Sequence, residues 1–256
     1  MFGRQKESQG GLLDAPPKTT FILGLFVGIA ATAIVSLIVV VPLLNSNDSS
    51  GAVKGTNTNT TNQAADADTG GSVVDIATPD SDTDHYRGAK PEEAAIVLVE
   101  YSDFQCPYCQ KFQPIAKQLV DDYDGQLSWV YRHFPLSGHA NAKPAAEAAE
   151  CAGKLGGNDV FWQYADKLYV NQNSLSKDYY KELAGELGLN AAKFASCLDS
   201  GEFTSKIEAQ FNEGASAGVN GTPASIVLPG NDTSKGQLVS GALPVDQFKK
   251  IIDAAL

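Results

Sequence analysis

Basic residues are scarce in this chain. The 19 lysines and arginines stand against 30 aspartates and glutamates, which leaves a formal net charge of −11. A protein that binds nucleic acid needs a basic face to displace the counterions of the phosphates. The composition therefore argues against a nucleic-acid partner, and the acidic balance otherwise indicates only good solubility.

Cysteine is also rare, with four residues in a chain of 256. Four are too few for a chain of this length to be a disulfide-stapled scaffold. Cys106 and Cys109 are separated by two residues, whereas Cys151 and Cys197 stand alone. An even number of cysteines suits an oxidising compartment. The close pair could form a structural disulfide, half of a metal site or a redox-active pair. Other features of the sequence distinguish among these three.

Charge is missing altogether from residues 21–44, which read FILGLFVGIAATAIVSLIVVVPLL. A helix of this length is longer than the hydrocarbon core of a bilayer, which is ~30 Å thick. The run therefore predicts a transmembrane helix. The alternative is a cleaved signal peptide followed by secretion, because Ala31-Thr32-Ala33 resembles a cleavage site. The apolar run continues to Leu44, which favours the uncleaved anchor.

Positive residues set the expected orientation of this helix. Arg4, Lys6 and Lys18 precede it, while the only charged residue among 45–50 is Asp48. Positive residues concentrate on the cytoplasmic side of single spans. Residues 1–20 are therefore predicted to form a short cytoplasmic N-terminus, which places the rest of the chain outside the cytoplasm.

Apolar residues are sparse between residues 45 and 88, where Ser, Asn, Thr, Gly, Asp and Ala dominate. Such a segment offers too little apolar surface to offset the entropy of ordering the chain. It is predicted to be a flexible linker, in which residues 73–76 are a candidate for a short edge strand. The folded domain is expected at residues 89–256.

The domain alternates strand and helix patterns. Residues 94–101 form a continuous β-branched apolar run, which is typical of a strand covered on both faces. Helical periodicity follows over 110–122, and a second strand is predicted at 127–133. Residues 140–214 indicate at least four helices. The chain ends with two strands at 224–228 and 237–240 and an amphipathic helix at 244–255.

This order, β-α-β, a helical insert at about 139–215 and then β-β-α, resembles the α/β thioredoxin fold of DsbA-like thiol-disulfide oxidoreductases. The resemblance covers roughly residues 90–256 and rests on motifs at matching positions. These are Phe104-Gln-Cys-Pro-Tyr-Cys109 at a strand-helix junction, Glu100 six residues before Cys106, Pro114 in the following helix, Tyr131-Arg-His-Phe-Pro-Leu136 with His139 and Ala142, and Gly221-Thr-Pro-Ala224 before a strand.

Placed at a helix N-terminus, Cys106 is expected to be a thiolate nucleophile, because unpaired amides and the helix dipole lower its pKa. Cys109, one turn further on, is expected to be less exposed and to resolve the mixed disulfide. Pro107 and Tyr108 carry no cation, so the dipeptide does not determine the direction of electron flow. A metal site is disfavoured because zinc ribbons present a second close cysteine pair.

The resemblance implies further site residues. Glu100 would exchange protons with Cys109 through water, although a solvated strand-end carboxylate is the alternative. Pro223 would be a cis proline whose neighbour Thr222 pairs with an extended substrate beside Pro107 and Tyr108. Cys151 and Cys197 would form a structural disulfide, with two buried thiols or a second redox pair as alternatives.

Histidines are few as well, and two follow the second strand. His133 is expected to be structural rather than catalytic, and His139 is given no role. Trp129, Phe161 and Trp162 are expected in the core.

The resemblance also implies a function: a membrane-tethered dithiol oxidase that introduces disulfides into exported proteins. A quinone-linked membrane partner would re-oxidise it, and no dissociable cofactor is expected. One alternative is a disulfide reductase or isomerase of the same fold. Another is a thioredoxin-like module that binds peptides or partner domains without catalysis.

Overall fold

The computed structural model describes residues 76–256. The predicted N-terminus at 1–20, the predicted transmembrane helix at 21–44 and linker residues 45–75 lie outside the described residues. Within 76–256, no helix is both long and apolar enough to cross a membrane.

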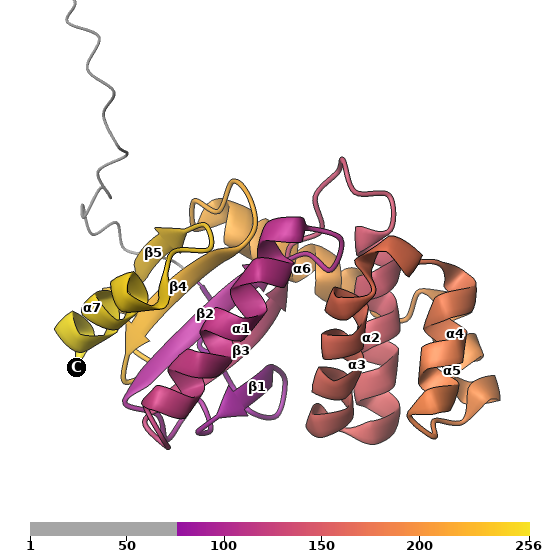
Figure 1. The fold of residues 1–256 in the computed structure, drawn as a ribbon, viewed down its shortest axis with the longest axis horizontal. Coiled ribbons are helices and arrows are strands. Elements are labelled where there is room, and N and C mark those ends of the chain that lie inside the picture. The colour runs from indigo at the N-terminus through magenta and orange to yellow at the C-terminus, as the bar shows by residue number, and fades with distance from the viewer. Residues whose placement is uncertain (1–75) are drawn as a thin grey trace, which may run out of the picture. The chain divides into compact units, whose positions relative to one another are not determined.

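Strands and helices follow one another as the sequence patterns predict (Figure 1). In chain order they are β1 His85–Gly88, β2 Ile96–Ser102, α1 Pro107–Asp122, β3 Leu127–His133, α2 Ala142–Gly156, α3 Asn158–Val170, the short 3-10 helix η1 Gln172–Ser174, α4 Lys177–Glu186, α5 Ala191–Ser200, α6 Thr204–Ser216, β4 Ala224–Pro229, the 3-10 helix η2 Thr233–Lys235, β5 Gln237–Ser240 and α7 Val245–Ala255. The insert therefore contains five α-helices, and the expected thioredoxin-like α/β fold is confirmed.

The five strands form one sheet in the order β1-β3-β2-β4-β5. Only β2 and β3 run parallel, and the other three pairs are antiparallel. Every residue of β2 and β3 is buried, which explains their nearly continuous apolar runs. In this register Glu100 lies between Tyr131 on β3 and Ser225 on β4. Cross-strand neighbours share a face, so these side chains belong to the same side of the sheet.

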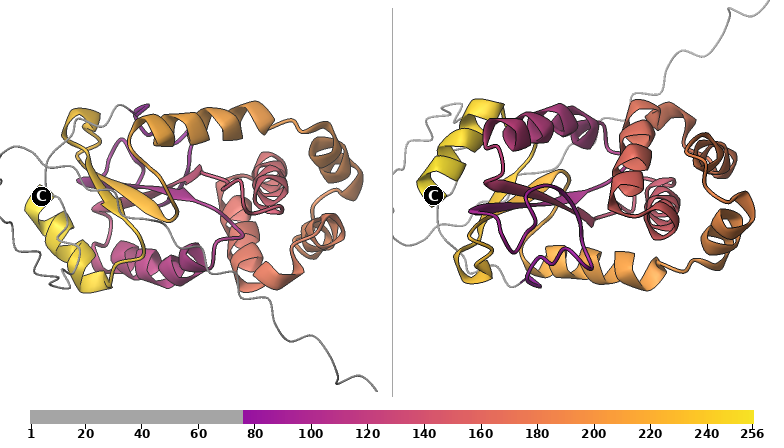
Figure 2. Two further views of the ribbon diagram at one scale, coloured as in Figure 1. Left: turned by 90° about the horizontal axis from the view of Figure 1, so that it is seen from above. Right: turned by 90° about the horizontal axis from the view of Figure 1, so that it is seen from below.

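Helices cover both faces of the sheet. Figure 2 shows α1 and α7 on one face and α6 on the other, with α2–α5 gathered beyond one end of the strands. The core divides accordingly: Ile96 and Leu98 pack toward α1, whereas Val97 and Val99 pack in the cluster on the α6 side. Gly214 lets α6 approach closely, because a Cβ atom there would lie 2.6 Å from the Tyr101 ring.

The predicted linker at 45–88 extends too far toward the C-terminus. Residues 85–88 form β1, which pairs with β3, so these residues belong to the domain. Of the candidate edge strand at 73–76, residues 73–75 lie outside the described residues, and Ile76 belongs to no strand.

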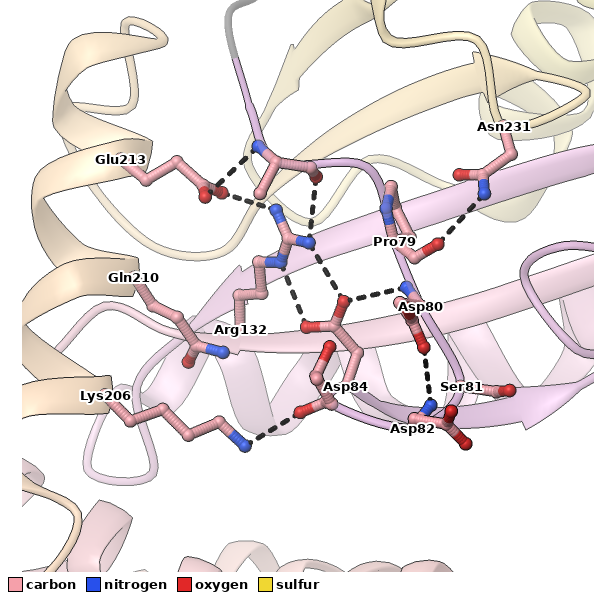
Figure 3. Close-up of polar contacts among 12 residues, drawn as sticks. Pro79, Asp80, Ser81, Asp82, Asp84, Arg132, Lys206, Gln210, Glu213 and Asn231 are labelled. Carbon is pink, nitrogen blue, oxygen red and sulfur yellow. Dashed lines mark hydrogen bonds and ion pairs between the residues drawn. The ribbon is translucent and has the colours of Figure 1, made fainter.

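A buried ion-pair network helps to hold residues 77–84 against the sheet. Arg132 on β3 donates to both carboxylate oxygens of Asp84, at 3.2 and 2.9 Å, and to the carbonyl of Ala77 at 3.0 Å (Figure 3). Glu213 on α6 pairs with the same guanidinium. A composition argument weighs apolar residues, so it misses a segment that polar contacts to a buried arginine help to fix.

Candidate active site

The two thiols lie where β2 passes into α1. Cys106 is the N-cap residue of α1, with φ −76° and ψ 122°, and Pro107 occupies the first turn. Proline fits there because its missing N–H has no helical partner to lose. Both cysteines are free thiols. Cys106 is 3 % exposed and Cys109 has no exposed surface, so the second thiol is the deeper one, and the first is more enclosed than a surface nucleophile would be.

The environment of Cys106 favours its thiolate. Its pKa is lowered to about 5, first by a hydrogen bond from Cys109 and then by Thr222 and the backbone amides of Cys109 and Tyr108, while burial acts in the opposite direction. These amides belong to the first turn of α1, where N–H groups have no helical acceptor. The helix start therefore stabilises a negative charge on the first sulfur.

The loop before β4 faces this sulfur. The Thr222–Pro223 peptide bond is cis. The Cys106 thiol donates to the carbonyl oxygen of Thr222 at 3.3 Å. Pro107 and Tyr108 were also assigned to substrate contact; they stand between the two cysteines, and Tyr108 is 60 % exposed. The structure thus brings Cys106 against the loop of Thr222 and Pro223, which lies more than a hundred positions later in the sequence.

Glu100 is fully buried on β2. Its Oε2 accepts a hydrogen bond from the indole Nε1 of Trp129 at 2.9 Å, whereas Oε1 has no hydrogen-bond partner among the described residues. Burial raises the pKa of Glu100 to about 7, despite opposing hydrogen bonds. The alternative of a solvated strand-end carboxylate is therefore wrong. A carboxyl group with this pKa can both accept and release a proton near neutral pH.

Cys109 has the opposite electrostatics to Cys106. Its pKa is raised well above the ordinary value, mainly by burial, then by its hydrogen bond to Cys106 and by the charge of Glu100. The pair is thus asymmetric: the first sulfur favours the thiolate and the second holds its proton. With this asymmetry Cys106 can react with the sulfur of a substrate, and Cys109 can later resolve the mixed disulfide that forms.

Sequence reasoning missed the polar residues around this pair. Ser102 and Tyr169 share a hydrogen bond of 2.8 Å, and Tyr131 and Tyr169 share one of 2.9 Å, all buried. Trp129 was expected only as core, yet it donates to Glu100. Strand alternation could have placed Trp129 and Tyr131 on the same face, but only the register shows that this face carries Glu100.

The helical insert also contacts the active-site loop. The side-chain amide of Gln172 in η1 donates to the carbonyls of Phe104 and Cys106, both at 2.8 Å. Gln110 on α1 donates to the carbonyl of Tyr169 at the end of α3. Val170, the next residue, is 75 % exposed. The insert therefore fixes the loop that carries the first cysteine.

Cys151 on α2 and Cys197 on α5 are bonded to each other, with an S–S distance of 2.00 Å. This is the pairing that the resemblance implies. Within residues 76–256, no group of three or more His, Cys, Asp or Glu residues is arranged to hold a metal ion.

His133, the last residue of β3, and His139, in the loop after it, have separate partners. His133 is buried and lies 2.9 Å from Glu150, which also contacts His85 and Lys206. This environment agrees with the structural role expected for His133. His139, left without a role by the sequence, lies 2.7 Å from the Asp103 carboxylate.

A thioredoxin-type sheet with an asymmetric Cys-Pro-Tyr-Cys pair beside a cis proline defines the class of thiol-disulfide oxidoreductases. The thioredoxin family model matches residues 80–254, and the chain belongs to this family. Within it, the solved structures point to DsbA: Pseudomonas aeruginosa DsbA2 is 26 % identical, with a TM-score of 0.58 over 68 % of this chain and 95 % of that chain. The domain therefore has a DsbA-like thioredoxin fold.

Other solved structures share the fold. A thioredoxin-like oxidoreductase from Silicibacter pomeroyi is 26 % identical, with a TM-score of 0.57 over 67 % of this chain and 91 % of that chain. The thiol-disulfide exchange protein alpha-DsbA2 of Wolbachia pipientis is 22 % identical, with a TM-score of 0.56 over 68 % of this chain and 88 % of its own.

Curated relatives match over a smaller part of their own length. A protein named Na(+)/H(+) antiporter NhaA 3 from Salinispora tropica is 36 % identical over 157 residues, which are 60 % of this chain and 23 % of the antiporter. The NhaA antiporter of Herminiimonas arsenicoxydans is 33 % identical over 58 % of this chain and 23 % of its own length. The matched region therefore spans less than a quarter of these relatives.

Proposed function

We propose that the protein is a dithiol oxidase that introduces disulfides into exported proteins. The observation that supports this direction most strongly is the asymmetry of the pair, because the pKa of Cys106 is about 5 and that of Cys109 is raised well above the ordinary value. A stabilised thiolate favours the reduced form of the enzyme, so the oxidised form gives up its disulfide readily.

In the proposed cycle, a substrate thiolate attacks the sulfur of Cys106 in the oxidised pair. The Cys106–Cys109 bond breaks, and Cys109 leaves as a thiolate and takes up a proton, for which Glu100 is the nearby carboxyl group. A second substrate thiolate then attacks the substrate sulfur of the mixed disulfide, and Cys106 leaves as a stabilised thiolate. Two electrons have passed to the enzyme, and the substrate carries a disulfide.

The loop at Thr222 and Pro223 would present the substrate. Its backbone faces Cys106 and can pair with an extended peptide as an added strand does. Pro107 and the exposed Tyr108 would line the same approach. Re-oxidation by a quinone-linked membrane protein is part of the proposal by family resemblance, and no cofactor is needed for the exchange itself.

The site would act outside the cytoplasm. The uncharged run at 21–44 and the positive residues before it support a single membrane anchor with its N-terminus in the cytoplasm. A secreted form, released by cleavage of that run, is the alternative.

The reduction potential of the full-length chain, measured against glutathione, tests the direction of electron flow. A potential near that of DsbA, about −120 mV, is expected, whereas one near that of thioredoxin, about −270 mV, would favour a reductase. Cys106→Ser should abolish dithiol oxidation, and Cys109→Ser should trap mixed disulfides with substrates. A Cys106→Ser variant that loses dithiol oxidation but keeps the full biological activity of the protein would instead indicate a non-catalytic binding module.

A further inference from the structure

Asp103 lies in the loop between β2 and the reactive thiol, and its carboxylate is fully buried. Oδ1 accepts a hydrogen bond from the backbone N–H of Gln105 at 2.7 Å. Oδ2 accepts one from the backbone N–H of Leu136 at 3.0 Å and lies 2.7 Å from Nδ1 of His139. The carbonyl of Asp103 also accepts the backbone N–H of Cys106 at 3.0 Å. One residue thus contacts both backbone amides that immediately precede α1.

His139 is the side-chain partner of this carboxylate. A carboxylate only accepts hydrogen bonds, so Nδ1 of His139 must carry the proton and donate. His139 sits in the loop between β3 and α2, where its own N–H bonds to the carbonyl of Leu136. Its side chain is 26 % exposed, so a substitution there does not open the core.

The two loops are joined at further points. The N–H of Phe134 donates to the carbonyl of Ser102 at 2.8 Å, and the N–H of Asn141 donates to Oε1 of Gln105 at 2.7 Å. Asp103 lies between these contacts and provides the only charged group in the connection among the described residues. The loop that carries Cys106 is therefore held against the beginning of the insert, and its geometry sets how the sulfur faces the first amides of α1.

We propose that Asp103 and His139 form a positioning pair for the reactive thiol: the buried carboxylate, held by the imidazole, fixes the loop so that the sulfur of Cys106 meets the amides of Tyr108 and Cys109. The pair does not touch the substrate. The inference rests on the thiol exchange proposed for Cys106, and it adds two residues for which the family resemblance implied no function.

The test uses full-length protein and four single variants. His139→Ala removes the donor, and His139→Asn keeps an N–H donor near the position of Nδ1. Lys143→Ala is the matched control, because it removes an exposed ion pair with Glu208 in the same insert. The readouts are the pH dependence of Cys106 alkylation by iodoacetamide, the exchange constant with glutathione and the melting temperature.

His139→Ala should raise the apparent pKa of Cys106 by about one unit, which means about tenfold less thiolate below that pKa. The exchange constant should shift about tenfold toward a weaker oxidant. His139→Asn should recover most of both changes, and Lys143→Ala should leave both unchanged. Asp103→Asn tests the pair from the other side and should act in the same direction as His139→Ala.

A lowered melting temperature in His139→Ala with unchanged Cys106 pKa and unchanged exchange constant would overturn the positioning function and leave a purely structural contact. If Asp103→Asn does not fold, the two His139 variants decide alone. Failure of the wild-type chain to exchange with glutathione would contradict the proposed function itself, and this outcome is distinct because it requires no variant.

Discussion

Glu100 is the only acidic side chain on β2, and it lies without exposed surface near a thiol whose pKa it raises. Its single strong contact is the indole of Trp129, and its second oxygen has no partner among residues 76–256. Gln113, one turn beyond Cys109, also has both side-chain amide atoms buried, with no hydrogen-bond partner in the described part of the chain. Groups with strongly shifted pKa values cluster at functional sites, so we expect Glu100 to exchange protons with Cys109.

The pKa of Glu100 predicts how its ionisation affects stability. The folded protein holds this proton up to about pH 7, whereas the unfolded chain releases it near the ordinary value of 4.5. Stability is therefore lost as the pH rises between these values, by up to about 3 kcal/mol. Glu100→Gln should remove this loss, so the variant should be more stable than wild type at pH 8 and similar at pH 4.

Urea unfolding of the reduced protein across this pH range measures the effect, with the exposed Glu93→Gln as control. If the free energy of unfolding changed with pH in the same way for wild type and Glu100→Gln, the Glu100 carboxyl group would ionise freely in the folded protein. The same variant should slow the release of a mixed disulfide by Cys109, because the nearby proton acceptor is gone.

At the scale of elements, the Cys151–Cys197 bond joins α2 to α5 and closes a loop across 46 positions. In the chain-entropy account such a closure stabilises the fold by roughly 4 kcal/mol. The double variant Cys151→Ala/Cys197→Ala should therefore lose about this much unfolding free energy. Its glutathione exchange constant should stay unchanged, because neither helix carries an active-site residue. A large shift in the exchange constant would show that the insert disulfide takes part in the redox site.

Arg132 is the second element-scale feature, because one guanidinium links β3, α6 and the segment before β1 (Figure 3). Removing one partner of a buried ion pair typically destabilises by about 3–5 kcal/mol, since the other charges stay buried. Arg132→Met should show a loss of this size and faster amide exchange in residues 76–88.

The double variant Arg132→Met/Asp84→Asn provides the control. It removes the Asp84 charge, which Arg132→Met alone leaves buried without its partner. It should recover part of the stability lost by Arg132→Met alone. Equal stability of Arg132→Met and wild type would mean that the network contributes little.

For the whole molecule, the prediction concerns the part of the chain before the domain. With residues 21–44 intact, the protein should sediment with membranes and require detergent for release, because a run of this length spans a bilayer. Deleting 21–44 should move it to the soluble fraction. The domain should be open to protease from outside the cell but not from the cytoplasm. Cytoplasmic cleavage of the domain would reverse the proposed topology.

Much of the fold follows from local patterns. The strands at 127–133 and 237–240 have the bounds that their sequences predict, because β-branched and aromatic residues in short segments favour strands. The cysteine pair stands between a strand and a helix, and the proline at its centre suits a first turn. These are properties of neighbouring residues, so the linear sequence contains them.

The amino-acid sequence by itself thus determined the thioredoxin-like order of elements, the reactive pair and its position at a helix N-terminus, because each depends on residues close along the chain. Only the tertiary structure decided that Trp129 binds Glu100, that Asp103 meets His139 and that Arg132 fastens residues 77–84 to the sheet. These contacts join residues 29 to 55 positions apart. Strand register and crossover connections bring them together, and neither is encoded in the periodicity of any one segment.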